Sequence, residues 1–357
     1  MMTDYRIFIA GLVFAALVVL VCASGCIDNE AQKTSIRVVP AGSLVLPFEE
    51  AAKEFEQLHP GVDVQIEGHG SIQAVRQVTD LHRPVDVVAV ADETLIPDLM
   101  FRPIEGGTGN YSDWYIPFAK NRMVIAYTGK SAYANEITTE NWFRILMRPG
   151  VRVGFSNPML DAAGYRAIMV VTLADEAYPG NEILPDLIGN HFNPPLPVRE
   201  ENGTITITLP EVMRPADDRV VIRDGSVALM SLLEAGGIDY AFEYRSVAEG
   251  QDVLYVDLPA SIDLSSAKYR DQYKKVKVVL GFQRFSTIGK ERTGGPVIYA
   301  ITVPTTASHP DLAEEFVGYA VERSRSGGRG WPAPLDANEH PLAYRRVTSM
   351  TAGEDTR

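Results

Sequence analysis

The sequence predicts an α/β protein that folds into two lobes joined by two crossovers of the chain. With 357 residues and 46% hydrophobic content, the chain is long enough for two lobes that each bury a core. Short runs of β-branched residues alternate with amphipathic helical segments from residue 36 to residue 321. Four times, such a strand ends in a short polar turn that opens a helix, which is typical of parallel sheets.

Residues 1–26 are predicted to be a targeting segment. A hydrophobic run follows Arg6 and ends in small residues before Cys26, the pattern of a lipoprotein signal peptide in which Cys26 becomes the lipidated first residue. An uncleaved membrane anchor is the alternative, because the run is near the lower length limit for crossing a bilayer. Either way, the folded body is expected outside the cytoplasmic membrane, with residues 27–35 as a polar tether.

Charge and cysteine usage exclude two classes of function. The formal net charge is -13 and no long Lys/Arg run is present, which argues against binding of nucleic acid. The second cysteine, Cys22, lies within the hydrophobic run, so the folded body has neither a disulfide nor thiol chemistry. An acidic protein must bind a small anion through local dipoles and hydrogen bonds.

The first two strand–helix units each contain a Gly-Ser pair. A strand at residues 36–40 leads through Ser43 into an amphipathic helix, and a strand at residues 61–66 leads through Ser71 into another. The free N–H groups at a helix start can bind an anion. Because the carboxyl ends of parallel strands meet at one edge, the two serines either share an anion or each caps its own helix.

Further polar residues follow later strands. Asp92 comes after an apolar strand at residues 85–90 that is typical of a sheet covered on both faces, and helix capping is favoured for it over a place in the crevice. Asp161 follows a strand at residues 151–155 and opens a helix to residue 174, where capping and ligand binding are equally favoured.

The remaining segments complete the predicted order. Strands or helices are expected at residues 95–100, 114–127, 137–146, 204–208, 219–223, 226–233, 238–247, 253–258, 276–280, 299–303 and 310–321, with an irregular stretch at 178–215. The segments 114–127 and 238–247 are interpreted as the crossovers. The predicted organisation is therefore residues 36–117 and 246–340 for the first lobe, 118–245 for the second, and 341–357 as a loose tail. Asn110 and Asn202 begin possible glycosylation sequons.

Taken together, these motifs resemble the archaeal tungstate/molybdate-binding lipoproteins that serve ABC importers, over roughly residues 35–340. The matching stretches are residues 41–44, 70–71, 76–81, 86–89, 91–92, 95–97, 114–118, 121, 141–142, 161–166, 239–240 and 244–248. The resemblance implies a two-lobed, type II periplasmic-binding-protein-like fold with the ligand in the cleft between the lobes. It also implies a monomer without a cofactor, anchored through Cys26 to the outer face of the cell membrane, whose partner is the importer's permease.

The resemblance assigns roles to individual side chains. Ser43 and Ser71 would donate hydrogen bonds to the oxyanion from the first lobe, and Tyr244 would contribute from the return crossover. Asp161 would add an oxygen to the metal centre of the oxyanion, as a glutamate does in the family to complete an octahedral shell. In this chain Ser226 stands where that glutamate is expected, and Ala162 stands where the aspartate motif usually has proline.

Three explanations for Ser226 are open. Ser226 donates a hydrogen bond in a four-coordinate cage, or Asp224 supplies the carboxylate, or Glu243 does so, although strand alternation points Glu243 away from the face that Tyr244 uses. The first is favoured, because a carboxylate that faces a dianion without bonding its metal is repelled by several kcal/mol at about 4 Å. Asp161 must then ligate the metal, be protonated, or point at its own helix.

The leading function is therefore capture of tungstate or molybdate for an ABC importer, with a receptor for another tetrahedral oxyanion, such as sulfate or phosphate, as the alternative. An enzyme is disfavoured, because no Gly-x-Ser-x-Gly elbow, His-Glu-x-x-His helix or Walker loop is present and the six histidines show no ligand spacing. A structural or adhesive surface lipoprotein is the third possibility, and the lack of repeats argues against it.

Overall fold

The computed structural model describes residues 33–281 and 291–335. The chain divides into two compact units, Met1–Thr34 and Ser35–Arg357, and the fold described here is that of the second. The predicted signal peptide with Cys26, most of the tether and the tail after residue 340 lie outside the described residues. Within the described ranges, no helix is both long and apolar enough to span a bilayer.

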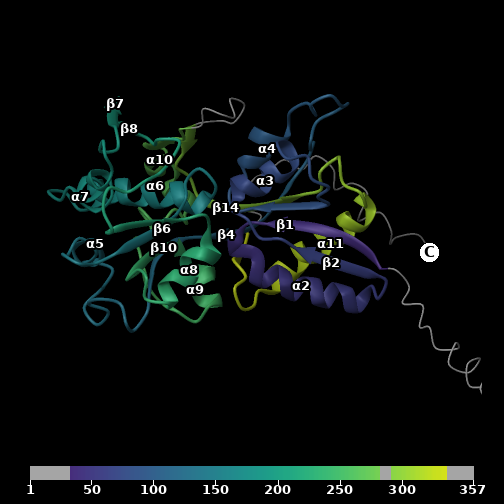
Figure 1. Cartoon of the computed structure of the whole chain (residues 1–357), viewed down its shortest axis with the longest axis horizontal. Coiled ribbons are helices and arrows are strands. Elements are labelled where there is room, and N and C mark those ends of the chain that lie inside the picture. Colours follow the sequence, from purple (N-terminus) through teal and green to yellow (C-terminus); the bar gives the residue numbers. More distant parts are fainter. Residues whose placement is uncertain (1–32, 282–290, 336–357) are drawn as a thin grey trace, which may run out of the picture. The chain divides into compact units, whose positions relative to one another are not determined.

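A six-stranded sheet contains the first and the last described strands, β1 and β15. Its strand order is β15-β4-β14-β3-β1-β2, with β1 and β3 parallel and β14 antiparallel to both β3 and β4. Helices cover both faces, α3 and α4 on one side and α2 on the other (Figure 1). The bounds are β1 (Thr34–Pro40), β2 (Val62–Ile66), β3 (Val87–Val90), β4 (Ile116–Asn121), β14 (Val297–Thr302), β15 (Ala333–Pro334), η1 (Gly42–Leu44), α2 (Val45–Leu58), α3 (Ser71–Thr79), α4 (Leu95–Met100) and α11 (Pro310–Ser326).

A five-stranded sheet lies in the middle of the chain. Its order is β11-β5-β10-β6-β9, in which β10, β6 and β9 run parallel and β5 runs antiparallel to β10. Helix α6 covers one face and α8 the other (Figure 1). The bounds are β5 (Met123–Tyr127), β6 (Val153–Ser156), β9 (Val220–Arg223), β10 (Tyr240–Tyr244), β11 (Leu254–Asp257), α5 (Trp142–Leu146), α6 (Ala162–Ala177), α8 (Ser226–Glu234) and α9 (Arg245–Gly250).

A four-stranded sheet, β13-β12-β8-β7, packs against α6 through β12. The sequence analysis predicted β8 and β12 as strands but missed β7 and β13, and it treated residues 178–215 as otherwise irregular. All four residues of β7 are exposed, so the apolar alternation that marks a strand is missing there. The bounds are β7 (Val198–Glu201), β8 (Thr204–Thr208), β12 (Val276–Val279), β13 (Glu291–Thr293), α7 (Ile183–Leu187), η2 (Gly189–His191), η3 (Ala267–Tyr269) and α10 (Arg270–Tyr273).

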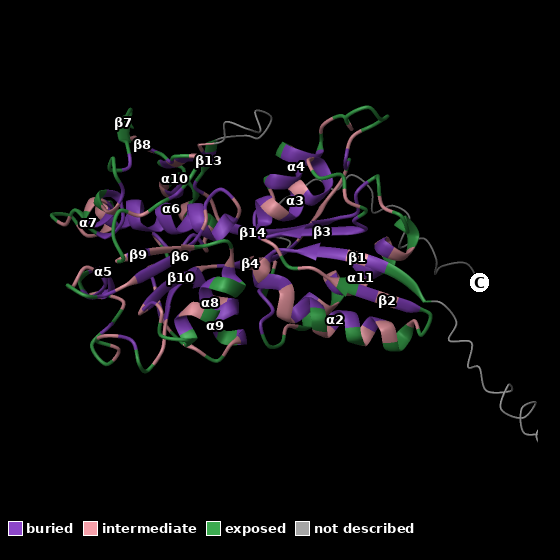
Figure 2. Ribbon diagram, in the orientation of Figure 1, coloured by how far each residue is buried: buried purple, intermediate pink, exposed green. Residues whose placement is uncertain are grey.

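The central strands of the two larger sheets are buried along their whole length (Figure 2). Every residue of β3, β6 and β10 is buried, as expected for strands with helices on both faces. The uniformly apolar sequence of the β3 region predicted this arrangement, because a strand with one wet face would alternate in polarity.

Sheet membership differs from the boundaries predicted between the lobes. The chain leaves the six-stranded sheet after Asn121 rather than at residue 117, and β11 still belongs to the five-stranded sheet although it was assigned to the first lobe. The predicted strand 238–247 ends at Tyr244 and continues as α9. The start of α9 is bonded to Asn121 of β4: the Asn121 side chain donates to Ser246 Oγ (2.8 Å) and accepts from the backbone N–H of Ser246 (3.4 Å).

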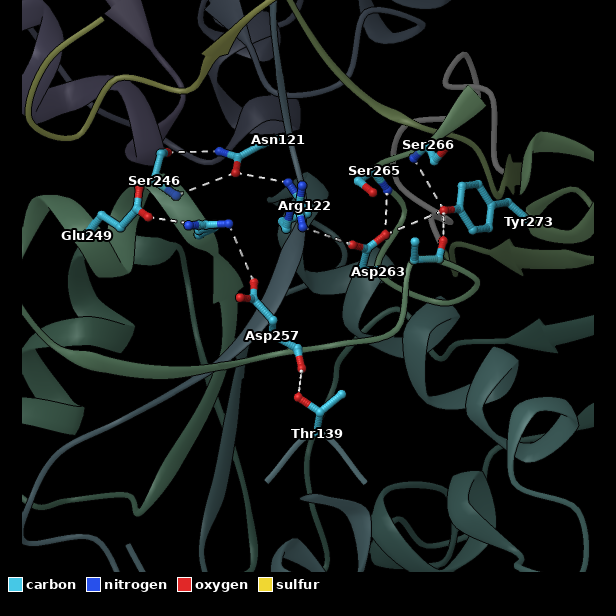
Figure 3. A network of polar contacts seen from close by, with 12 residues as sticks. Asn121, Arg122, Thr139, Ser246, Glu249, Asp257, Asp263, Ser265, Ser266 and Tyr273 are labelled. Carbon is cyan, nitrogen blue, oxygen red and sulfur yellow. Dashed lines mark hydrogen bonds and ion pairs between the residues drawn. The ribbon is translucent and has the colours of Figure 1, made fainter. Parts of the chain in front are cut away.

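The connection between β4 and β5 is held on both sides by polar contacts (Figure 3). Arg122 accepts the backbone N–H of Arg245 at its carbonyl, and its guanidinium lies 3.9 Å from Asp263 Oδ2. Asp263 also accepts the backbone N–H of Ser265 (2.9 Å). A cavity of about 410 Å³ lies here, lined by Arg122, Arg245 and Trp331 among others.

Candidate functional site

The carboxyl ends of the parallel strands in the six-stranded sheet form the first edge of the site, defined as residues 41–43, 69–71 and 91–92. Pro40 pairs with Ala89 in the parallel β1–β3 ladder, and Ala41 forms a parallel bridge with His69. The Gly-Ser turns of the first two units and the turn after β3 are therefore neighbours, as parallel pairing requires.

The five-stranded sheet forms the second edge in the same way, defined as residues 156–161, 223–226 and 243–244. Strand β6 lies between β10 and β9 and is parallel to both, and Ser156 pairs with Arg223 at its carboxyl end. The chain then continues from β6 to Asp161, from β9 to Ser226, and from β10 into α9. The acidic and hydroxyl side chains that follow these strands thus gather at one edge.

The two edges are in contact. The backbone N–H of Ser71 donates to Asp161 Oδ1 at 3.3 Å, and the N–H of Ile72 donates to the carbonyl of Leu160 at 3.0 Å. A Cβ atom on Gly70 would lie 2.4 Å from that carbonyl oxygen, so only glycine allows this approach. One on Gly42 would lie 3.6 Å from the Cβ of Ser226, an ordinary contact. The structure is therefore a closed form.

Ser43 and Ser71 do not cap helices. Leu44 is the N-cap of α2 and Gly70 that of α3, and neither makes a side-chain capping bond. Instead, Ser43 Oγ accepts a hydrogen bond from the hydroxyl of Tyr299 (3.0 Å), and Ser71 Oγ accepts one from the backbone N–H of Ala91 (3.0 Å). A serine hydroxyl that accepts a bond still has its own proton to donate. Both buried serines can therefore donate to an anion.

Asp161 occupies the N-cap position of α6 but makes no capping hydrogen bond. Its side chain is almost fully buried, and while Oδ1 accepts from Ser71, Oδ2 has no hydrogen-bond partner among the described residues. Burial raises the pKa of Asp161, against smaller opposing effects of the Ser71 N–H, the Ser156 hydroxyl and the N–H groups of Ala163 and Ala162 at the start of α6. Asp161 therefore faces both its own helix start and the first edge.

Glu243 lies at the second edge, contrary to the expectation from strand alternation. It is fully buried, its Oε1 accepts the N–H of its neighbour Tyr244 (2.8 Å), and its Oε2 is unpaired among the described residues. Burial raises the pKa of Glu243 to about 8; the Tyr244 N–H and the Ser226 hydroxyl oppose this rise, and the charge of Asp161 adds to it. Alternation fixes the direction of Cβ, whereas a glutamate reaches further and here turns back along the end of the strand.

The two other candidates at this position differ in exposure. Ser226, the first residue of α8, is buried, and its hydroxyl has no hydrogen-bond partner in the described part of the chain. Asp224 is exposed, which removes it as a source of the missing carboxylate. The Ser156 hydroxyl is likewise buried and forms no hydrogen bond of normal geometry within the described ranges. The same holds for one oxygen each of Asp161, Ser226 and Glu243, although the Ser156 hydroxyl is near enough to Asp161, and the Ser226 hydroxyl near enough to Glu243, to lower the pKa of each carboxyl.

Tyr244 is positioned by an arginine that the sequence reasoning did not single out. Arg166 donates to the Tyr244 hydroxyl (2.7 Å) and to the carbonyl of Ala91 (2.6 Å), which joins the second edge to the first. Its other nitrogen lies 3.7 Å from Asp92 Oδ2. The sequence feature that could have identified Arg166 is the Gly-Tyr-Arg triplet after Asp161, because it places an arginine within the buried stretch of α6.

Asp92 joins the two edges rather than acting only as a cap. Its Oδ1 accepts from the N–H and hydroxyl of Thr94, which fixes the turn before α4, and its Oδ2 accepts from the hydroxyl of Tyr165 at 2.5 Å. Burial alone would raise the pKa of Asp92, but the cations Arg166 and Arg292 outweigh it and hold this pKa below its ordinary value. Asp92 is therefore an ionised contact between the edges.

The arrangement is chemically a closed anion site. Hydroxyl donors come from both edges, and Asp161 and Glu243 each add a buried carboxyl oxygen that forms no hydrogen bond of normal geometry with the described residues. In residues 33–281 and 291–335, no group of three or more His, Cys, Asp or Glu side chains is arranged to hold a metal ion.

A closed site between the strand ends of two α/β sheets defines a class, the solute-binding proteins of ABC transporters, which bind and do not catalyse. A model of the bacterial extracellular solute-binding protein family matches residues 36–325, and the chain belongs to this family. The chain is 43% identical over 287 residues to an uncharacterized solute-binding protein of Methanoculleus marisnigri, covering 80% of this chain and 77% of that one. The prediction of a non-enzymatic binding protein is thereby confirmed.

Two further comparisons concern a relative and the fold. The chain is 38% identical over 324 residues to the molybdate/tungstate-binding protein WtpA of Thermococcus kodakarensis, covering 87% of this chain and 86% of that protein. The solved sulfate-binding protein SubI of Mycobacterium tuberculosis H37Rv superposes with a TM-score of 0.54 at 15% identity, over 85% of this chain and 88% of SubI. This likeness confirms the predicted α/β periplasmic-binding-protein fold.

Proposed function

We propose that the protein captures tungstate or molybdate outside the cell and delivers it to the permease of an ABC importer. In this proposal, the six-stranded sheet and its helices form one lobe and the other two sheets form the second. Ser43, Ser71, Ser226 and Tyr244 contact the oxygens of the anion, and Asp161 adds an oxygen to its metal centre. The protein acts as a monomer held at the outer face of the membrane by a lipid on Cys26.

The observation that carries the proposal is the state of Asp161. A buried carboxyl with an unpaired oxygen, facing hydroxyl donors across a closed contact, repels an ordinary dianion. It attracts an anion whose central atom accepts another oxygen, because the metals of molybdate and tungstate are Lewis acids with room for more ligands. The identity to WtpA supports the same choice of ligand.

Another tetrahedral oxyanion, such as sulfate or phosphate, is the second candidate. The buried, unpaired hydroxyl of Ser226 favours it, because neutral donors are what a four-coordinate anion needs. The two candidates differ in what they require of Asp161, since a fully deprotonated anion such as sulfate gains nothing from a carboxylate at that position.

Isothermal titration of the purified full-length protein in detergent with tungstate, molybdate, sulfate and phosphate, at fixed ionic strength, tests the proposal. We expect tight binding of the two metal oxyanions and no heat from sulfate. Asp161→Asn should weaken tungstate binding by at least about tenfold, whereas the exposed control Asp224→Asn should leave it unchanged. Sulfate binding as tight as tungstate binding would establish the second candidate, and no binding of any of the four anions would refute both.

A further inference from the structure

We propose that Glu243 is a second carboxylate ligand of the bound metal oxyanion, and that Asp161 and Glu243 together exclude anions whose central atom accepts no further oxygen. This inference rests on the proposed function and deepens it, because it names the residue that sets specificity. It begins from four buried atoms, one on each of Ser156, Asp161, Ser226 and Glu243, that form no hydrogen bond of normal geometry with any described residue.

The placement of Glu243 is fixed by the fold. Strand β10 pairs with β6 in parallel, with Ala241 opposite Gly154, so its carboxyl end lies beside the end of β6 and the turn that leads to Asp161. Oε1 is held by the N–H of Tyr244, which leaves Oε2 as the oxygen available to a ligand. The side chain is therefore positioned at one end and unpaired at the other.

The charges that face Glu243 do not neutralise it. The neighbouring titratable groups are Asp161 at the start of α6 and Tyr299 on β14, and both are acids. The nearby Arg166 is engaged with the hydroxyl of Tyr244, the carbonyl of Ala91 and Asp92. Strand β5, which pairs with β10 on its other side, contributes Val124 opposite Glu243. The elements packed around the carboxyl thus leave it without an ion-pair partner in the described part of the chain.

Two adjacent buried acids are stable together when a bound group supplies positive charge or when protons do so. A metal centre that binds both oxygens converts the repulsion between the two buried carboxyls into two bonds. A sulfate or phosphate ion offers no such centre, so it must face both carboxyls across a closed contact.

Comparing Glu243→Gln with wild type, and with Glu234→Gln as the matched control, tests this assignment. Glutamine keeps the shape and the acceptor for the Tyr244 N–H but is a poor metal ligand, and Glu234 is an exposed glutamate at the end of α8. We expect Glu243→Gln to lose about 100-fold in tungstate affinity and to gain measurable sulfate binding, with Glu234→Gln unchanged. X-ray absorption at the tungsten edge should show one fewer oxygen around the bound metal in Glu243→Gln than in wild type.

The outcomes separate this inference from the proposed function. Tight tungstate binding by Glu243→Gln, with an unchanged oxygen shell, would overturn the role of Glu243 and leave the function standing. Wild-type protein that binds no tungstate or molybdate would overturn both. A melting temperature measured without ligand shows whether Glu243→Gln folds, and Glu243→Asp, which keeps a carboxylate on a shorter side chain, should retain more tungstate affinity than Glu243→Gln.

Discussion

Replacing Glu243 with glutamine should also change how the stability of the ligand-free protein depends on pH. Burial raises the pKa of Glu243 from 4.5 to about 8 in the folded protein. Between these values the folded chain holds a proton that the unfolded chain has lost, so the free energy of unfolding falls as the pH rises through this window. Glutamine does not titrate, so Glu243→Gln should lack this loss.

The magnitude follows from the size of the pKa change. At 1.36 kcal/mol for each pKa unit, a rise from 4.5 to about 8 corresponds to about 5 kcal/mol of stability lost above pH 8. This is an upper limit, because Asp161 shares the same surroundings and its pKa is raised as well. Glu243→Gln should therefore match wild type near pH 4 and exceed it by up to about 5 kcal/mol near pH 9. The slope that remains in the variant belongs to Asp161 and other groups.

Urea unfolding of the ligand-stripped protein, followed by tryptophan fluorescence at a series of pH values between about 4 and 9, measures this difference. Glu234→Gln serves as the control, because it makes the same chemical change at an exposed position on α8. Parallel pH profiles for wild type and Glu243→Gln would refute the reasoning, since they would mean that Glu243 ionises equally easily in the folded and unfolded chain.

Two further predictions concern the contact between the edges. Gly70→Ala should abolish tight binding of tungstate without lowering the melting temperature of the ligand-free protein, because the added Cβ would meet the Leu160 carbonyl at 2.4 Å only on closure. The control Gly42→Ala, whose Cβ would lie 3.6 Å from the Cβ of Ser226, should bind tungstate normally. Equal titration curves for the two variants would contradict this prediction. Tyr165→Phe removes the hydrogen bond to Asp92 and should weaken tungstate binding by about tenfold through a less stable closed form; unchanged affinity in the same titration would show that the bond is not needed for closure.

The sequence predicted the parts of the fold that local pattern controls. Strands β1, β3 and β6 are short apolar runs that end at polar turns, so their positions, and the neighbouring places of the two Gly-Ser turns, followed from periodicity and from the geometry of parallel sheets. The exposed strand β7 has no such pattern and was missed. Local signals identify where a strand ends, because the end is marked by the residues on either side of it.

The partners of individual side chains lay beyond local pattern. Ser43 looks like a helix cap because a serine before an apolar helix usually is one, but a turn of 3-10 helix places it one residue too early and against Tyr299. The contact of Asp92 with Tyr165 joins residues 73 positions apart, and its formation depends on how the two sheets pack. The direction of the Glu243 side chain depends on a rotamer choice that alternation does not determine.

The unpaired atoms at the second edge connect binding to closure. In an open form, water would satisfy the polar atoms of Ser156, Asp161, Ser226 and Glu243, whereas in the closed form these four buried atoms make no hydrogen bond of normal geometry with any described residue. Each unsatisfied buried group costs about 1–3 kcal/mol, which opposes closure of the empty protein. An anion that bonds to these atoms removes this free-energy cost only in the closed form. It therefore binds the closed form more tightly than the open form and shifts the equilibrium towards closure. Contacts between the edges, such as Asp92 with Tyr165, oppose this penalty in the empty protein, and a bound anion adds its own bonds to them.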